Sequence, residues 1–126
     1  MIDINKQIIF WRDGASEDIE VSRELITNKR VRQGLFFLHL SLEKLIKALV
    51  CKHTNDIAPR THNLTRLSEA TSLHLDQNYM DILAELNAFN IEGRYPDSNI
   101  IPVSQAEAFD YLKRADEVFK WLMSQL

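Results

Sequence analysis

The hydrophobic pattern of this chain centres on residues 35–52, with the sequence LFFLHLSLEKLIKALVCK. The first half of this segment is apolar on nearly every side, and only His39 interrupts it. A helix without a polar face must be enclosed by its own protein, because no side of it can stand in water. From Glu43 onward the apolar residues recur at i, i+3, i+4 spacing, which is typical of an amphipathic helix. We therefore expect one continuous helix at the centre of a bundle. Four of its leucines should form the core: Leu38, Leu42, Leu45 and Leu49.

The segment before it predicts a long amphipathic helix. Asp3 can cap its N-terminus, and the pattern continues to about Asn28. Gly14 lies inside this helix, where glycine costs roughly 1 kcal/mol relative to alanine. A close approach of a neighbouring helix at Gly14 would explain that residue. The inward stripe consists of Ile8, Trp11, Ala15, Ile19 and Ile26.

Two shorter helical patterns follow the central segment. A loop around Pro59 leads to a short third helix, which either Thr61 or Asn63 can cap. A fourth helix begins after either Asp76 or Asn78.

The last helix has the clearest start signal in the chain. Residues 92–103 hold one glycine and two prolines, so this stretch cannot be helical throughout. Ser104 and Glu107 then form a capping box, and the helix runs from there nearly to Leu126. No window shows the period-2 alternation of a strand. The sequence therefore predicts an all-α, antiparallel up-down bundle of four to five helices, with residues 1–126 forming a single domain.

Charge and composition narrow the expected partners and location of the chain. With 15 basic and 18 acidic side chains the net charge is -3, so nucleic-acid binding would need a local basic patch. Cys51 is the single cysteine and is expected to be a small buried hydrophobe. The charges within residues 35–52 argue against a membrane span, and the N-terminus has no secretion signal. A reducing cytoplasm is the expected location.

The histidines are the first candidates for chemistry, because their pKa lies near neutrality. They stand on separate predicted elements without metal-ligand spacing, so we expect no metal and no cofactor. His39, in apolar surroundings, is interpreted as a core histidine with one hydrogen-bonded nitrogen. His62 stands beside Thr61 and Asn63 at a helix start, where a capping role is favoured over ligand binding.

Glu43 and Lys44 allow two interpretations. In the structural one, Glu43 pairs with Lys47 on the surface, while Lys44 lays its stem along the protein. In the functional one, Lys44 reaches towards Arg94 and the two cations bind a phosphate.

Several segments together resemble the HEPN domain (higher eukaryotes and prokaryotes nucleotide-binding domain), a small antiparallel helical bundle. The similarity rests on their order and spacing, from about residue 8 to the end of the chain. The matching segments are Trp11 with Ala15 and Asp18, LEKLIKALV at 42–50, residues 61–64 with Leu67, and Arg-Tyr-Pro-Asp at 94–97.

The resemblance implies a homodimer, often paired with a minimal nucleotidyltransferase in a toxin–antitoxin system. Many members are metal-independent endoribonucleases whose motif is an arginine followed, four to six residues later, by a histidine. Arg94 is similar in position to that arginine, but Asn99, Ile100 and Ile101 stand where the histidine would be. A nucleotide- or RNA-binding or partner-docking module is therefore favoured. A ribonuclease toxin with a degenerate motif, and with Arg94 as its catalytic residue, is the alternative.

The candidate ligand-binding residues are accordingly Lys44, His62, Arg94, Tyr95 and Asp97. Tyr95 could stack on a base. For Arg94 and Asp97 a structural role in anchoring the non-helical loop is an equal or stronger alternative.

A homodimer is also expected from apolar residues that remain after the inward stripes are assigned, because apolar patches usually mark partner surfaces. These residues are Phe36, Phe37 and Leu40 on the central helix, and Tyr111, Trp121 and Met123 on the last.

Overall fold

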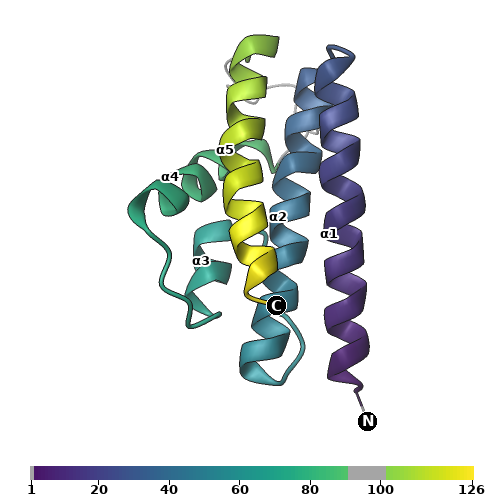
Figure 1. Cartoon of the computed structure of the whole chain (residues 1–126), viewed down its shortest axis with the longest axis vertical. Helices are drawn as coiled ribbons and strands as arrows, with labels where there is room; N and C mark the ends of the chain where they lie inside the picture. The colour runs from purple at the N-terminus through teal and green to yellow at the C-terminus, as the bar shows by residue number, and fades with distance from the viewer. Residues whose placement is uncertain (1, 91–101) are drawn as a thin grey trace.

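A computed structural model describes residues 2–90 and 102–126, and every regular element within them is helical. The helix α1 runs upward in Figure 1, α2 descends beside it, α3 and α4 return along one side, and α5 descends again. The predicted all-α, up-down bundle is confirmed. In chain order the elements are α1 (Ile4–Thr27), α2 (Val31–Thr54), α3 (Leu64–Glu69), α4 (Gln77–Leu86), the short 3-10 helix η1 (Asn87–Phe89) and α5 (Gln105–Ser124).

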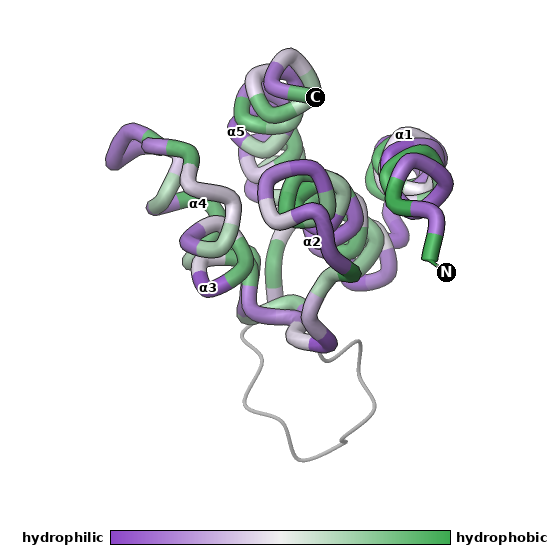
Figure 2. The backbone as a smooth tube through the Cα atoms, turned by 90° about the horizontal axis from the view of Figure 1, so that it is seen from below, coloured by the Kyte–Doolittle hydropathy of each residue, from purple (hydrophilic) through white to green (hydrophobic). Residues whose placement is uncertain are grey.

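The central position of α2 explains the apolar run in its sequence. It contacts α1, α3, α4, η1 and α5, and Figure 2 shows it lying between α1 on one side and the remaining helices on the other. Residues 35–52 all lie within this one helix, as predicted. The four leucines expected in the core have no exposed surface: Leu38, Leu42, Leu45 and Leu49.

Side chains close the helix starts where the sequence predicted them. The Asp3 carboxylate accepts a hydrogen bond from the backbone N–H of Lys6. Of the paired alternatives, Asn63 caps α3 and Asp76 caps α4. Ser104 forms its capping box at the start of α5. Each cap satisfies a backbone donor that the helix itself leaves without a partner.

The close approach of α1 and α2 occurs at Gly34, so the expectation for Gly14 is wrong. A Cβ added to Gly34 would lie 2.6 Å from Cγ1 of Ile26 and 3.2 Å from its backbone nitrogen. The Ser22 hydroxyl also donates a hydrogen bond of 2.8 Å to the Gly34 carbonyl. At Gly14 the three atoms nearest to an added Cβ all belong to the Lys44 side chain, with Cδ at 3.1 Å, and none to the backbone of α2.

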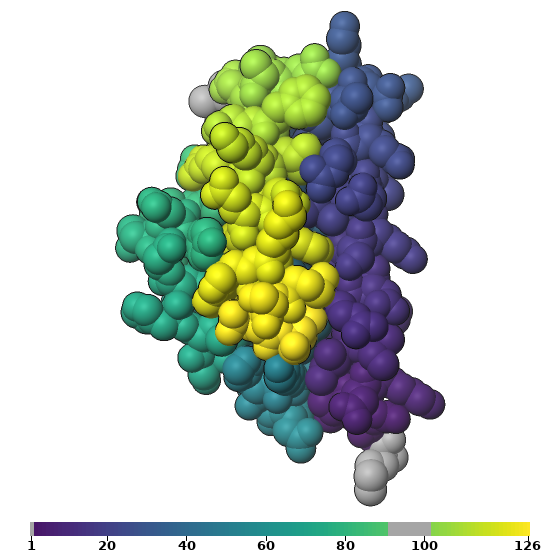
Figure 3. Space-filling model, viewed as in Figure 1, coloured from purple at the N-terminus to yellow at the C-terminus, as the bar shows by residue number. Residues whose placement is uncertain are grey.

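Two of the α5 aromatics named for a dimer surface, Tyr111 and Trp121, pack partly against other rings of the bundle. The Trp121 ring lies 5.7 Å from that of Tyr79, and the Tyr111 ring lies 5.3 Å from that of Phe89. Figure 3 shows α5 covering one face of the molecule between α4 and α1. The six residues singled out for a dimer surface are all half-buried. Among the described residues, the large hydrophobic side chains that are exposed are instead Ile2, Ile9, Phe10, Ile57 and Phe109.

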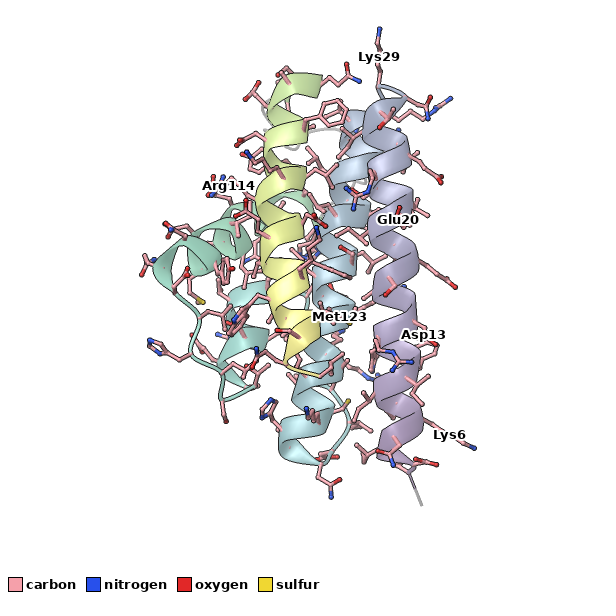
Figure 4. The ribbon with its side chains drawn as sticks, viewed as in Figure 1. Lys6, Asp13, Glu20, Lys29, Arg114 and Met123 are labelled. Atoms are coloured by element: carbon pink, nitrogen blue, oxygen red, sulfur yellow. The ribbon has the colours of Figure 1, made fainter. Side chains whose placement is uncertain are left out.

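The remaining surfaces follow from the helix periodicity. Lys6 and Asp13 lie on the solvent side of α1 (Figure 4), whereas Glu20 lies 3.6 Å from Arg23, which also pairs with Asp116 of α5. No helix in the described ranges is long and apolar enough to cross a membrane.

Cys51 is fully buried, and burial raises the pKa of its thiol, as expected for a packing residue rather than a nucleophile.

Candidate functional site: a carboxylate–histidine pair beside a polar pocket

Two of the segments that carry the family resemblance contact each other across the α1–α2 interface. Lys44 on α2 forms an ion pair of 2.7 Å with Asp18 on α1. One turn further along α2, the Lys47 ammonium lies 5.2 Å from the centre of the Trp11 ring. These contacts give Trp11 and Asp18 structural roles in holding α1 against α2.

Glu43 lies at the centre of a buried polar cluster. Its Oε2 atom accepts a hydrogen bond of 3.0 Å from the Lys47 ammonium, one helical turn away. The predicted pair is therefore confirmed, but its placement on the surface is wrong. The side chains of Glu43 and Lys47 are only 5% and 7% exposed. Charges removed from water in this way need partners at both ends.

His39 is a core histidine with one hydrogen-bonded nitrogen, as predicted. Its Nε2 atom lies 2.9 Å from the backbone carbonyl of His62, so Nε2 carries the hydrogen and donates it. Its Nδ1 atom lies 3.9 Å from Glu43, too far for a hydrogen bond. His39 thus ties the segment before α3 to the centre of α2.

His62 does not cap α3, so that interpretation is wrong. Its Nδ1 atom lies 3.0 Å from Oε1 of Glu43. An ionised carboxylate only accepts hydrogen bonds, so Nδ1 of His62 must carry a hydrogen. In the neutral ring the other nitrogen, Nε2, is then left with a free lone pair. The His62 side chain is 61% exposed, so its ring is accessible from solvent. The buried Glu43 carboxylate thus fixes the tautomer of an accessible imidazole.

A polar pocket of about 430 Å³ opens beside His62. Arg60 contributes a cation, and Asn87 and Asn90 contribute amides from η1 and from the residue just after it. Asn87 is held in place because its Oδ1 accepts a hydrogen bond from the Leu64 backbone and its Nδ2 donates one to Asn63. The full lining is Arg60, Thr61, His62, Asn63, Asn87 and Asn90.

The sequence-predicted candidates are distributed as follows. His62 lies in the pocket, whereas Lys44 pairs with Asp18 on the α1 side of α2 and is not among the lining residues. Arg94, Tyr95 and Asp97 lie outside the described residues, so the predicted pairing of Lys44 with Arg94 stays a prediction. Within the described ranges, no group of three potential metal ligands is present.

The sequence did not reveal Arg60, Asn87 and Asn90 as neighbours of His62, nor Glu43 as its partner. One signal was present for Glu43: a carboxylate in a helix that is otherwise enclosed must find partners of opposite charge or hydrogen-bond donors. The asparagines gave no signal, because they join the pocket through the packing of η1 against α2.

Burial lowers the pKa of His39 below its ordinary value of 6.5, outweighing the opposite effect of nearby Glu43. The unfolded chain therefore binds a proton at His39 more readily than the folded one. The free energy of unfolding should be fully retained above about pH 6.5 and should fall below it, by up to about 1.4 kcal/mol per pH unit from this group.

Urea unfolding at pH 7.5 and 5.5 measures this effect. His39→Gln retains a donor for the His62 carbonyl but does not titrate, so the loss between these two pH values should shrink. His74→Gln, on the exposed surface, should leave the wild-type loss intact. An equal loss in the wild type and His39→Gln would contradict the assignment.

The fold and the buried cluster define a class: a helical bundle whose central helix positions a carboxylate–histidine pair beside a polar pocket. A family model for the HEPN domain matches residues 8–126, and the chain belongs to the HEPN domain family. The resemblance seen in the sequence is confirmed.

Two solved structures are similar to the whole bundle. The crystal structure of TT1696 from Thermus thermophilus aligns with a TM-score of 0.82 at 15% identity, covering 95% of this chain and 98% of that one. ST0689, an archaeal HEPN homologue, aligns with a TM-score of 0.72 at 18% identity, covering 99% of this chain and 98% of that one. At these identities the similarity establishes the fold. No curated protein sequence matches the chain.

Proposed function

We propose that this HEPN protein is a nucleotide- or RNA-binding module and that the pocket beside His62 is its binding site. The observation that carries the proposal is the combination of Arg60, an exposed imidazole and asparagine amides around one pocket. A guanidinium is suited to a phosphate. A histidine ring can stack on a base, and amides can hydrogen-bond its edges, which is how proteins recognise unpaired nucleotides.

The charge distribution supports a local site rather than a general affinity for nucleic acid. The chain as a whole carries a net charge of -3, so attraction of a polyanion depends on individual cations such as Arg60. Arg60 is exposed and forms no ion pair within the described part of the chain. Its charge is therefore available to a ligand. Arg94, Tyr95 and Asp97 remain predicted contributors, because they follow Asn90 closely in the chain.

Family membership supports two further parts of the proposal: a homodimer, and a minimal nucleotidyltransferase as partner in a toxin–antitoxin pair located in the cytoplasm. On α1, exposed Ile9 and Phe10 offer apolar surface for a protein partner.

Fluorescence anisotropy with a labelled single-stranded RNA, and calorimetry with AMP and ATP, test the proposed binding. Arg60→Ala should weaken binding roughly tenfold, because a charge-assisted hydrogen bond to phosphate contributes about 1.5–3 kcal/mol. Arg66→Ala is the matched control, since Arg66 is exposed on α3 but does not line the pocket.

No binding by the wild type to any of these ligands would remove the proposal, and equal losses in Arg60→Ala and Arg66→Ala would move the site elsewhere. Light scattering on the same samples reports whether the protein exceeds the 14.7 kDa of one chain.

A further inference from the structure

We infer that the pocket binds a phosphodiester, and that Arg60 holds it together with a His62 ring that takes up a proton on binding. The inference rests on the proposed binding function and deepens it, because it names the chemical group recognised and the charge that His62 carries in the complex. No bond of the ligand is made or broken. The residues that carry it are Glu43, Arg60, His62 and the lining of two pockets, and none of them lies within 91–101.

The neutral His62 ring presents a lone pair rather than a donor to the pocket. Its one ring hydrogen is on Nδ1, which lies 3.0 Å from Oε1 of Glu43. Nε2 forms no hydrogen bond to any residue within 2–90 or 102–126, and the ring lines the pocket. A proton on Nε2 turns this atom into a donor while the bond to Glu43 is kept. A bound anion and a protonated His62 therefore favour each other, and each raises the affinity of the protein for the other.

Glu43 prevents the ring from meeting an anion in its other neutral form. With the hydrogen moved to Nε2, Nδ1 and the carboxylate would be two acceptors only 3.0 Å apart. The carboxylate is held in place, since Glu43 is 4% exposed and its other oxygen accepts a hydrogen bond of 3.0 Å from buried Lys47. The carbonyl of His62 also accepts a hydrogen bond of 2.9 Å from His39. Uptake of a proton is therefore the way in which His62 becomes a donor to the ligand.

The charges around His62 come from two segments. On α2, Glu43 faces Nδ1 and is paired with Lys47, while His39 bonds to the backbone carbonyl rather than to the ring. Next to His62 in the chain, Arg60 lines the same pocket and adds a positive charge. In the empty pocket this charge opposes a proton on His62, and a phosphate bound to both cations removes the opposition. The other lining residues are uncharged: Thr61, Asn63, Asn87 and Asn90.

A second pocket adjoins the first at Arg60 and favours a diester over a terminal phosphate. It also has a volume of about 430 Å³, and Arg60 is the residue that lines both pockets. A group bound to Arg60 therefore borders two spaces, each within the size range of small-molecule sites. A phosphodiester carries a nucleoside on each side, whereas a terminal phosphate carries one. The second pocket offers apolar surface for a base from Ile57 and Pro59 in the loop and from Val50 on α2.

Calorimetry with the dinucleotide ApA at pH 7.5, in HEPES and in Tris, counts the protons taken up on binding. ApA has one diester and no terminal phosphate, so its charge is constant near neutrality, whereas a phosphate monoester titrates near pH 6. We expect an uptake of roughly half a proton or more per chain, and a Kd that falls by up to about tenfold per pH unit from pH 8 to pH 6.5.

His62→Gln is the variant that tests the titrating group, because glutamine donates hydrogen bonds but does not titrate. Proton uptake should fall to nearly zero, and the Kd for ApA should no longer depend on pH. A merely structural role of His62 would instead weaken binding and leave the proton uptake unchanged. His74→Gln is the matched control. His74 is exposed and does not line the pocket, so this variant should keep the wild-type uptake.

Glu43→Gln combined with Lys47→Met tests the tautomer, and it removes both buried charges together. The new amide can donate to Nδ1 of His62, so a neutral ring can carry its hydrogen on Nε2 and donate it to the ligand. ApA should still bind, with proton uptake reduced to about half of the wild-type value or less.

A comparison of ApA with AMP tests the second pocket. ApA should bind at least about tenfold more tightly at pH 7.5, because it can occupy both spaces beside Arg60. Ile57→Ala should weaken binding of ApA by roughly threefold or more and leave that of AMP unchanged.

The outcomes separate this inference from the proposed function. Absence of binding to ApA, to AMP and to longer single-stranded RNA removes both. Binding without proton uptake, or uptake that survives in His62→Gln, overturns the role of His62 and leaves the binding function standing. AMP that binds as tightly as ApA overturns the assignment of the diester, as does binding of longer RNA by a protein that does not bind ApA.

Discussion

Replacing Glu43 with leucine is expected to lower the free energy of unfolding by about 3–5 kcal/mol. Glu43 is the charge partner of Lys47, whose side chain is only 7% exposed. Without Glu43 the ammonium stays buried with no carboxylate partner among residues 2–90 and 102–126, and it keeps its contact with the Trp11 ring at 5.2 Å. His62 also loses the acceptor for its Nδ1 hydrogen. Urea unfolding at pH 7, followed by circular dichroism, measures the loss.

A double variant separates the two causes of this loss. Adding Lys47→Met to Glu43→Leu removes both charges and should recover most of the stability, because an apolar pair of similar volume is often as stable as a buried ion pair. Glu85→Leu is the control for an exposed pair. Its partner Arg114 stands on α5 facing α4 (Figure 4), and its loss should cost less than about 1 kcal/mol. If the double variant is as unstable as Glu43→Leu, the loss comes from the link to His62 rather than from Lys47.

The elements that the sequence predicted correctly are those set by local interactions. A cap such as Asp3 or Ser104 bonds within three residues of itself, so its spacing is visible in the chain. The burial of α2 was also predictable, since a helix with no polar face must be enclosed by the rest of the protein. Caps and apolar periodicity do not specify how the helices are arranged. The antiparallel bundle was predicted from the order of the segments that resemble the HEPN domain.

The candidate site was predicted only in part, because its contacts join distant segments. His62 meets Glu43 across 19 residues and a change of chain direction, which no periodicity encodes. The same physics explains the error over its capping role. Asn63 is the better cap, and the ring of His62 turns instead to a buried carboxylate that needs a second donor. The Glu43–Lys47 spacing predicted an ion pair, but its burial comes from distant segments: Trp11 on α1 lies beside Lys47, and His62 lies beside Glu43.

A second large effect is expected at the α1–α2 contact, where Gly34→Ala should cost about 1–3 kcal/mol as overpacking. The new methyl group would lie 2.6 Å from Cγ1 of Ile26, a side chain with no exposed surface and hence little room to move. It would also lie 3.3 Å from the Ser22 carbonyl, so the two helices must separate. Separation would in turn stretch the buried hydrogen bond from the Ser22 hydroxyl to Gly34.

Gly14→Ala is the matched control on the same interface. There the three atoms nearest to the methyl all belong to the long Lys44 side chain, with Cδ at 3.1 Å. The gain in helix propensity should leave the protein equally stable or up to about 1 kcal/mol more stable.

The source of the Gly34 effect can be checked with a double-mutant cycle. Ile26→Ala removes the atom that the new methyl would strike, at its own cost of roughly 2–5 kcal/mol for the cavity. If overlap with Ile26 is the cause, the pair Gly34→Ala and Ile26→Ala should lose less stability than the sum of the two single variants. Because the methyl partly refills the space that Ile26 leaves, the coupling should exceed the few tenths of a kcal/mol seen between independent sites. Strict additivity would mean that the backbone contacts of Gly34 with α1, rather than the Ile26 side chain, set the distance between the two helices.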